Sequence, residues 1–176
     1  MATNQFIPPF PSEVDRDAFG HYLSGFVDGE GSFILRLKSR VGSQVRSPYA
    51  CFTIGLRADD APILRQLQSF WQCGRIDFRA PHPGHPAVRY IVDNWGDLLR
   101  VVVPHFERYP LRAKKARDLV IWRQAVLVAA LTTRRSHLPR TGRRGFRPKW
   151  QPDERATFEG LIATLAAGRQ FSSPNS

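Results

Sequence analysis

Residues 22–33, YLSGFVDGEGSF, change the periodicity of the chain within a few positions. Before Asp28 the apolar residues recur at helical spacing, and after Ser32 they alternate with polar residues, as in a strand with one buried face. Gly25 and Gly29 fall on one face of the expected helix, although glycine inside a helix costs roughly 1 kcal/mol against alanine. Small residues four positions apart let the backbone of another helix approach closely. The segment therefore predicts a helix that leads into a strand and keeps one face for close packing.

Two acids, Asp28 and Glu30, stand at the end of this helix. Negative side chains are unfavourable there, because they face the negative end of the helix macrodipole. A divalent cation held by carboxylate oxygen would offset this, and Mg²⁺ takes only one or two protein carboxylates, with water and phosphate as its other ligands. A simpler interpretation is that Gly29 and Gly31 end the helix, but it leaves Gly25 unexplained.

The same periodicities predict the rest of the chain. The expected elements are helices over 15–28 (with Asp15 as N-cap), 59–71, 94–106 (with Asn94 as N-cap) and 113–131, a last helix from Pro152, and strands over 32–40, 49–57, 75–79 and 87–93. The alternation turns Phe78 toward the core, and it turns Cys51 and Thr53 toward the opposite face. The order αββαββα with further C-terminal helices predicts an α+β fold, with a four-stranded antiparallel sheet whose apolar face the helices cover.

Three segments are expected: a proline-rich extended arm over 1–14, a folded domain over 15–131, and a basic linker with a C-terminal helix over 132–176. With 176 residues the chain is long enough to bury one core. It has no apolar run long enough to span a membrane and no signal-peptide pattern at its start. Its cysteines, Cys51 and Cys73, form neither a disulfide framework nor a metal-binding pair.

The formal net charge of +11 favours a polyanionic partner, either nucleic acid or an acidic membrane surface. A membrane-surface role lacks the amphipathic cationic helix that it requires. Seven cations fall on the outward face of the expected sheet, spread over all four strands: Arg36, Lys38, Arg40, Arg57, Arg75, Arg79 and Arg89, with Asp77 among them. Arginine is the usual reader of guanine in the major groove. The charge pattern therefore favours nucleic acid over a merely solvated strand face.

The stretch from Leu23 to Gly31, LSGFVDGEG, resembles the motif of the LAGLIDADG homing endonucleases position by position, at the end of a helix and before a strand. The resemblance covers about residues 15–131 and implies a saddle-shaped sheet that lies along the DNA major groove. It implies that Gly25 and Gly29 form the interface between two motif helices. Since the chain has one such motif, it resembles the members that act as homodimers.

The resemblance also implies the catalytic residues. Glu30 stands where the family has its metal-binding acid, beside the Gly29 carbonyl, and Lys115 is the best match for the basic residue at the cleavage centre. Lys114 and Arg112 remain alternatives for that position. The implied cofactor is Mg²⁺, with Mn²⁺ as an alternative and Ca²⁺ supporting binding without cleavage.

The function implied is site-specific cleavage of both strands of DNA at a long pseudo-palindromic target. The alternative is a nucleic-acid binder without catalysis, such as an intron maturase, which would bind RNA, or a transcriptional regulator. The expected location is inside a cell, and the arginine richness favours a bacterial cytoplasm or nucleoid over an organelle.

Overall fold

The computed structural model describes residues 13–39, 46–82, 85–136 and 150–169. Its elements are α1 (Glu13–Glu30), β1 (Gly31–Ser39), β2 (Arg46–Arg57), a 3-10 turn (Ala58–Asp60), α2 (Ala61–Trp71), β3 (Arg75–His82), β4 (His85–Val92), α3 (Trp95–Asp97), a π-helical segment (Leu98–Val102), α4 (Val103–Arg108), α5 (Lys115–Ser136) and α6 (Pro152–Ala167). The predicted α+β fold with the order αββαββα is confirmed.

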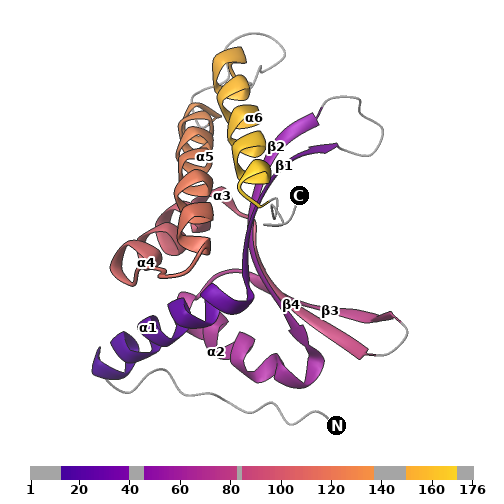
Figure 1. The fold of residues 1–176 in the computed structure, drawn as a ribbon, viewed down its shortest axis with the longest axis vertical. Coiled ribbons are helices and arrows are strands. Elements are labelled where there is room, and N and C mark those ends of the chain that lie inside the picture. The colour runs from indigo at the N-terminus through magenta and orange to yellow at the C-terminus, as the bar shows by residue number, and fades with distance from the viewer. Residues whose placement is uncertain (1–12, 40–45, 83–84, 137–149, 170–176) are drawn as a thin grey trace, which may run out of the picture.

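The sheet has the strand order β1-β2-β4-β3, and every neighbouring pair is antiparallel. The described helices lie to one side of this strongly curved sheet, and its other face is bare of helices (Figure 1). A long connection from β2 through α2 and β3 allows β4 to pair with β2, so the two hairpins form one continuous surface.

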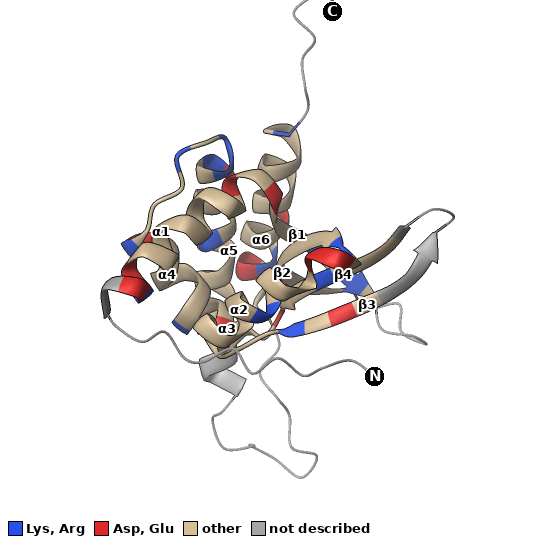
Figure 2. Ribbon diagram, turned by 90° about the horizontal axis from the view of Figure 1, so that it is seen from below, with Lys and Arg blue, Asp and Glu red and all other residues tan. Residues whose placement is uncertain are grey.

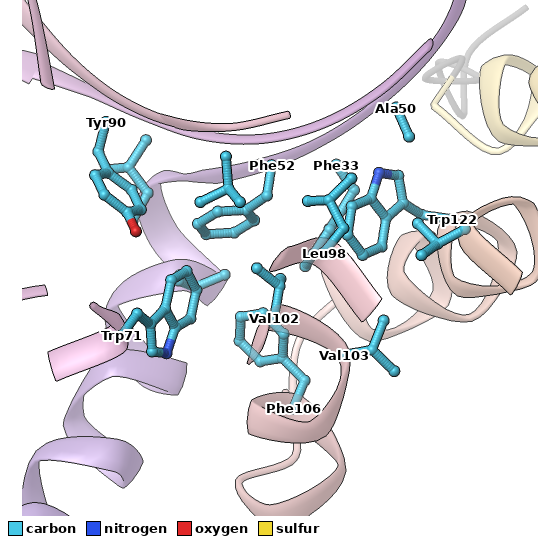
Figure 3. Close-up of a cluster of buried hydrophobic side chains, with 14 of the residues drawn as sticks. Phe33, Ala50, Phe52, Trp71, Tyr90, Leu98, Val102, Val103, Phe106 and Trp122 are labelled. Atoms are coloured by element: carbon cyan, nitrogen blue, oxygen red, sulfur yellow. The ribbon is translucent and has the colours of Figure 1, made fainter. Parts of the chain in front are cut away.

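The core lies between the sheet and the helices. Trp122 of α5 is fully buried, with its ring 5.2 Å from Phe33 of β1, and Trp71 of α2 lies 5.2 Å from Phe52 of β2 (Figure 3). Helix α6 adds Phe158, which is also fully buried. The C-terminal helix is therefore part of the same core as the sheet.

Several predicted boundaries of helices, strands and segments are wrong. Helix α1 begins at Glu13, so Asp15 is not its N-cap, and it continues through Glu30 into β1 without a loop. The basic linker expected from 132 begins inside α5, which extends to Ser136, and 137–149 lie outside the described residues, as do 1–12 of the arm. The loop expected up to Pro48 is shorter, because β2 already starts at Arg46. Strand ladders and helix hydrogen bonds extended these elements beyond their apolar patterns.

The helix starting at Asn94 is confirmed at its cap. The Asn94 side chain accepts hydrogen bonds from the backbone N–H of Gly96 at 2.8 Å and of Asp97 at 3.2 Å. This satisfies two of the donors that a helix N-terminus leaves without intrahelical partners.

The burial of three strand residues differs from the prediction. Phe78 is 56% exposed, because β3 is an edge strand and the β3–β4 hairpin extends beyond the helices (Figure 1). Cys51 and Thr53 are buried although they face away from the helices. They lie in β2, which has a neighbouring strand on each side, and the Thr53 hydroxyl donates to the Tyr90 carbonyl at 2.9 Å. Position in the sheet, rather than face alone, decided their exposure.

Candidate active site

The end of α1 is joined to the start of α5 through Asp28. Its Oδ2 accepts hydrogen bonds from the backbone N–H of Arg112 at 2.8 Å and of Ala113 at 3.2 Å. These two N–H donors stabilise the negative charge of the Asp28 carboxylate, which the helix dipole destabilises at this end of α1. For Asp28, therefore, backbone donors from a distant turn supply the compensation that the sequence analysis assigned to a cation.

Lys115 completes this junction. Its Nζ donates to the Gly29 carbonyl at 2.5 Å and to the Val27 carbonyl at 3.2 Å, so the ammonium satisfies two carbonyls at the C-terminal end of α1. Partial burial lowers the pKa of Lys115, while the carboxylates of Glu30 and Asp28 act in the opposite direction. Of the three candidate basic residues, Lys115 is the one whose side chain is hydrogen bonded to the motif helix.

Glu30 is exposed at the last position of α1, next to the Gly29 carbonyl. Carboxylate and carbonyl oxygens are the ligands that Mg²⁺ prefers, and this ion retains water and takes substrate phosphate for its other positions. Within the described residues no three His, Cys, Asp or Glu side chains come together to hold a metal. Glu30 and the Gly29 carbonyl together offer two oxygen ligands, which fits an open site where water and substrate phosphate take the other positions.

A cavity of about 480 Å³ opens beside this junction. It is lined by Gly31, Ser32, Lys114, Lys115, Arg117, Asp118, Gly168 and Arg169. The lining holds four cations and one carboxylate, a balance that favours an anion. Lys114 therefore contributes to the same surroundings as Lys115, while Arg112 lines a different hollow with Ser24 and Gly25.

Sequence reasoning did not find Arg169 at this cavity. It donates to Asp118 Oδ2 at 2.7 Å and to the Phe33 carbonyl at 2.6 Å, so it ties the end of α6 to both α5 and β1. No local pattern connects Arg169 with a carboxylate 51 positions earlier, and only the packing of α6 brings them together.

The outward face of the sheet carries the predicted cations. The strand register puts Arg36 opposite Tyr49, Arg89 opposite Gly55 and Asp77, and Arg75 opposite Ile91, all on the side away from the helices. Figure 2 shows Lys, Arg, Asp and Glu together on these strands. Lys38 and Arg57 share this face by their positions along the strands. Arg79 stands opposite Ala87 in the register, and Arg40 lies outside the described residues.

Several of these cations already have partners. Arg75 forms a bidentate ion pair with Asp93, and Arg57 pairs with Asp59 at 3.0 Å. The Arg36 guanidinium lies 4.9 Å from the centre of the Tyr49 ring, and the Lys38 ammonium lies 5.0 Å from it. The face is thus a connected polar surface rather than a row of independent charges.

Gly25 and Gly29 lie on an exposed face of α1. A Cβ built on either would meet no atom within 4 Å in the described chain. Ala18 and Tyr22 lie at helical spacing from them, and Tyr22 is 51% exposed. We call these four residues the outer face of α1, and at its two glycines the described chain leaves open space.

Comparison with known proteins gives a consistent picture. Residues 23–126 match a family model described as "LAGLIDADG endonuclease". The chain is 34% identical over 113 residues to an "Uncharacterized 50.9 kDa protein in ND4 intron 1" of Podospora anserina, covering 61% of this chain and 23% of that protein. It is 27% identical over 118 residues to "Homing endonuclease I-ApeII" of Aeropyrum pernix, covering 65% of this chain and 66% of that protein.

Solved structures have the same fold. The structure of I-SmaMI bound to cleaved DNA superposes with a TM-score of 0.68 at 22% identity, covering 95% of this chain and 55% of that one. I-GzeII in complex with its DNA target gives a TM-score of 0.66 at 18% identity, covering 97% and 48%. The chain thus spans about half of these structures and less than a quarter of the Podospora protein. These relatives include fungal proteins, and a bacterial host for this chain stays a prediction.

In the described part of the chain, no helix has the length and apolar character that a membrane crossing requires.

Proposed function

The chain belongs to the LAGLIDADG endonuclease family, and from this premise we propose that it cleaves both strands of DNA at a specific long site, as a homodimer that uses a divalent cation. The observation that carries the proposal is the junction between α1 and α5. There an exposed carboxylate, Glu30, lies beside Lys115, whose ammonium is hydrogen bonded to the Gly29 carbonyl. A protein that only bound a polyanion would have no use for an exposed acid at this position.

The homodimer is supported by the outer face of α1. Gly25 and Gly29 leave open space where the backbone of a second helix can approach. A two-fold axis between two packed α1 helices would bring together two copies of Glu30, one from each subunit.

We assign Glu30 and the Gly29 carbonyl to the metal, and we take the metal to be Mg²⁺, with Mn²⁺ able to replace it. The Gly29 oxygen has two lone pairs, so one can accept from Lys115 while the other faces the metal. A bound divalent cation stabilises the negative charge that develops on the scissile phosphate. The chain's own contribution is positional: α1 ends where Glu30 faces the substrate, and Asp28 fixes the turn that leads to Lys115. Lys115 adds positive charge beside the phosphate, and Lys114 and Arg117 extend that charge along the cavity.

Double-stranded DNA is the proposed partner of the outward sheet face. Its DNA-binding residues are proposed to be Arg36, Lys38, Arg40, Arg57, Arg75, Asp77, Arg79 and Arg89. A curved antiparallel sheet with arginines on one face can enter the major groove, where arginine reads guanine through O6 and N7.

The test is a cleavage selection on a randomised double-stranded DNA library. The parent should cut a related set of sequences with Mg²⁺, and with Ca²⁺ it should bind the same sequences and leave them intact. Glu30→Gln should slow cutting by about a thousandfold without weakening binding, because it removes a metal ligand and one negative charge near the phosphates. Glu107→Gln, at an exposed glutamate of α4, is the matched control and should cut like the parent.

Two variants separate the candidate basic residues. Lys115→Ala should slow cutting by about a hundredfold, and Lys114→Ala should slow it less. If Glu30→Gln cut at the parent's rate, the endonuclease proposal would be wrong. Binding of the library, or of RNA, with no cutting under any metal would identify the chain as a binder that shares the fold.

A further inference from the structure

One cluster on the outward sheet face joins three strands through side chains alone. Arg75 of β3 donates from Nη1 to Asp93 Oδ1 at 2.6 Å and from Nη2 to Asp93 Oδ2 at 3.0 Å. The Tyr49 hydroxyl of β2 donates to the same Oδ2 at 3.1 Å. Arg36 and Lys38 of β1 lie about the Tyr49 ring. We call these five residues the Asp93 cluster.

Asp93 is the half-buried centre of this cluster. Its side chain is 25% exposed, whereas that of Arg75 is 56% exposed, so the carboxylate is the more buried member of the pair. The Arg75 guanidinium holds the pKa of Asp93 below its usual range, and burial raises the pKa of the Tyr49 hydroxyl. At neutral pH the cluster thus contains a fixed negative centre that accepts, and a hydroxyl that stays protonated to donate.

Arg75 has more N–H donors than its ion pair with Asp93 uses. A guanidinium has five N–H donors, and Arg75 uses two of them, one from each Nη, on Asp93. Three donors remain, and two of them, the Nε–H and the second Nη2–H, point in parallel along one edge of the guanidinium. A parallel pair of donors is what the O6 and N7 of guanine accept. Asp93 therefore holds Arg75 with a guanine-reading edge to which no hydrogen bond from the described residues is assigned.

A second ion pair, at the end of β2, differs. Arg57 and Asp59 are two residues apart, and both side chains are 64% exposed. No described contact ties that pair to a third strand, so it fixes its arginine much less firmly. Exposed ion pairs contribute little and hold their side chains loosely.

We propose that Asp93 and Tyr49 are specificity-determining residues. They orient Arg75 so that it donates hydrogen bonds to a guanine at one position of the DNA target and disfavours other bases there. This rests on the proposed DNA-binding function of the sheet. Asp93 acts through Arg75 and is a positioning residue. Its negative charge also lowers the affinity for DNA of any sequence. The cluster therefore increases the discrimination between bases and decreases the overall affinity.

The experiment is a binding selection on the randomised DNA library with Ca²⁺, comparing the parent with Asp93→Asn, Arg75→Ala and Asp59→Asn. Asp93→Asn and Arg75→Ala should lose base preference at the same positions, by roughly tenfold or more in discrimination. Asp93→Asn should at the same time keep or raise its affinity for DNA of unrelated sequence. Asp59→Asn removes the same charge from the turn directly after β2 and should keep the parent's preference. A merely structural role for Asp93 would weaken binding to all sequences together.

Two further variants keep the test decisive if Asp93→Asn does not fold. Arg75→Lys retains the charge but not the parallel donors, and it should relax the same positions. Tyr49→Phe retains the ring and loses only the hydroxyl, so it should relax them less. Preference retained by Asp93→Asn, or lost equally by Asp59→Asn, would overturn the inference. A parent without any base preference would instead overturn the proposed function.

Discussion

The two faces of α1 use small residues for opposite purposes. On the inner face, a Cβ added to Gly20 would lie 2.4 Å from the ring of Tyr109, so this glycine is required by contacts within the chain. On the outer face, Cβ atoms added to Gly25 and Gly29 would meet nothing within 4 Å. The fold of one chain explains Gly20 and gives no reason for the other two.

The polar contacts follow the same division. Ser24, on the inner face, is buried, and its hydroxyl donates to the Tyr109 carbonyl at 2.6 Å, with His105 Nε2 3.4 Å away. Leu23 and Val27 beside it are also buried. The inner face is thus complete in one chain, while the outer face has its packing capacity unused. This difference supports a second copy of the chain as the partner of α1.

The largest effect is expected from a substitution on the outer face of α1. Gly25→Leu places a large side chain where two helix backbones are proposed to meet, and it should convert the dimer fully to monomer at micromolar concentration. Sedimentation equilibrium measures this directly. Gly160→Leu is the matched control, since Gly160 is an exposed glycine of α6 with nothing within 4 Å of an added Cβ.

The control should stay dimeric, and Gly25→Leu should retain the helical signal of a folded chain. A dimeric Gly25→Leu, or a parent that is monomeric throughout, would remove the distinction between the two faces of α1.

The next largest effect is expected from a substitution on the inner face of α1. Gly20→Ala forces Tyr109 to move, and overpacking of this kind costs about 1–3 kcal/mol. Denaturation by urea, at one protein concentration, should show that loss. Gly160→Ala should instead raise stability slightly, because alanine favours a helix where there is room. Equal stability of Gly20→Ala and the parent would contradict the packing described for Gly20.

The smallest effect concerns His105, which lies behind the inner face. Burial lowers the pKa of His105 to about 4, from an ordinary 6.5 in the unfolded chain. The unfolded chain therefore binds a proton that the folded chain excludes, so stability is complete above about pH 6.5 and falls as the pH drops toward 4. At pH 5.5 the loss should be roughly 1 kcal/mol.

Urea denaturation at pH 7.5 and 5.5 measures this loss. His105→Gln should lack that share of the pH dependence. His21→Gln, at an exposed position of α1, should keep most of it, because burial is the larger cause of the lowered pKa of His105. The same pH dependence in both variants would show that another group is responsible.

The sequence by itself determined the elements and the family. Periodicity depends on neighbours along the chain, so the change at residues 22–33 predicted a helix leading into a strand, and the apolar face of β1 was correct. The motif identified Glu30, and strand alternation put Arg36, Arg75 and Arg89 on one face, as the register confirms. Whether these residues cleave or bind DNA stays a prediction.

Only the tertiary structure decided which of these side chains have partners. Asp28 accepts from residues 84 and 85 positions away, and Arg169 reaches Phe33 from 136 positions away. Phe78 is exposed because it lies on an edge strand, in the β3–β4 hairpin that extends beyond the described helices (Figure 1). Such contacts depend on how the elements pack, and a local pattern carries no record of them. This is why the sequence located the acid and the basic face but not the Asp93 cluster that joins three strands of that face.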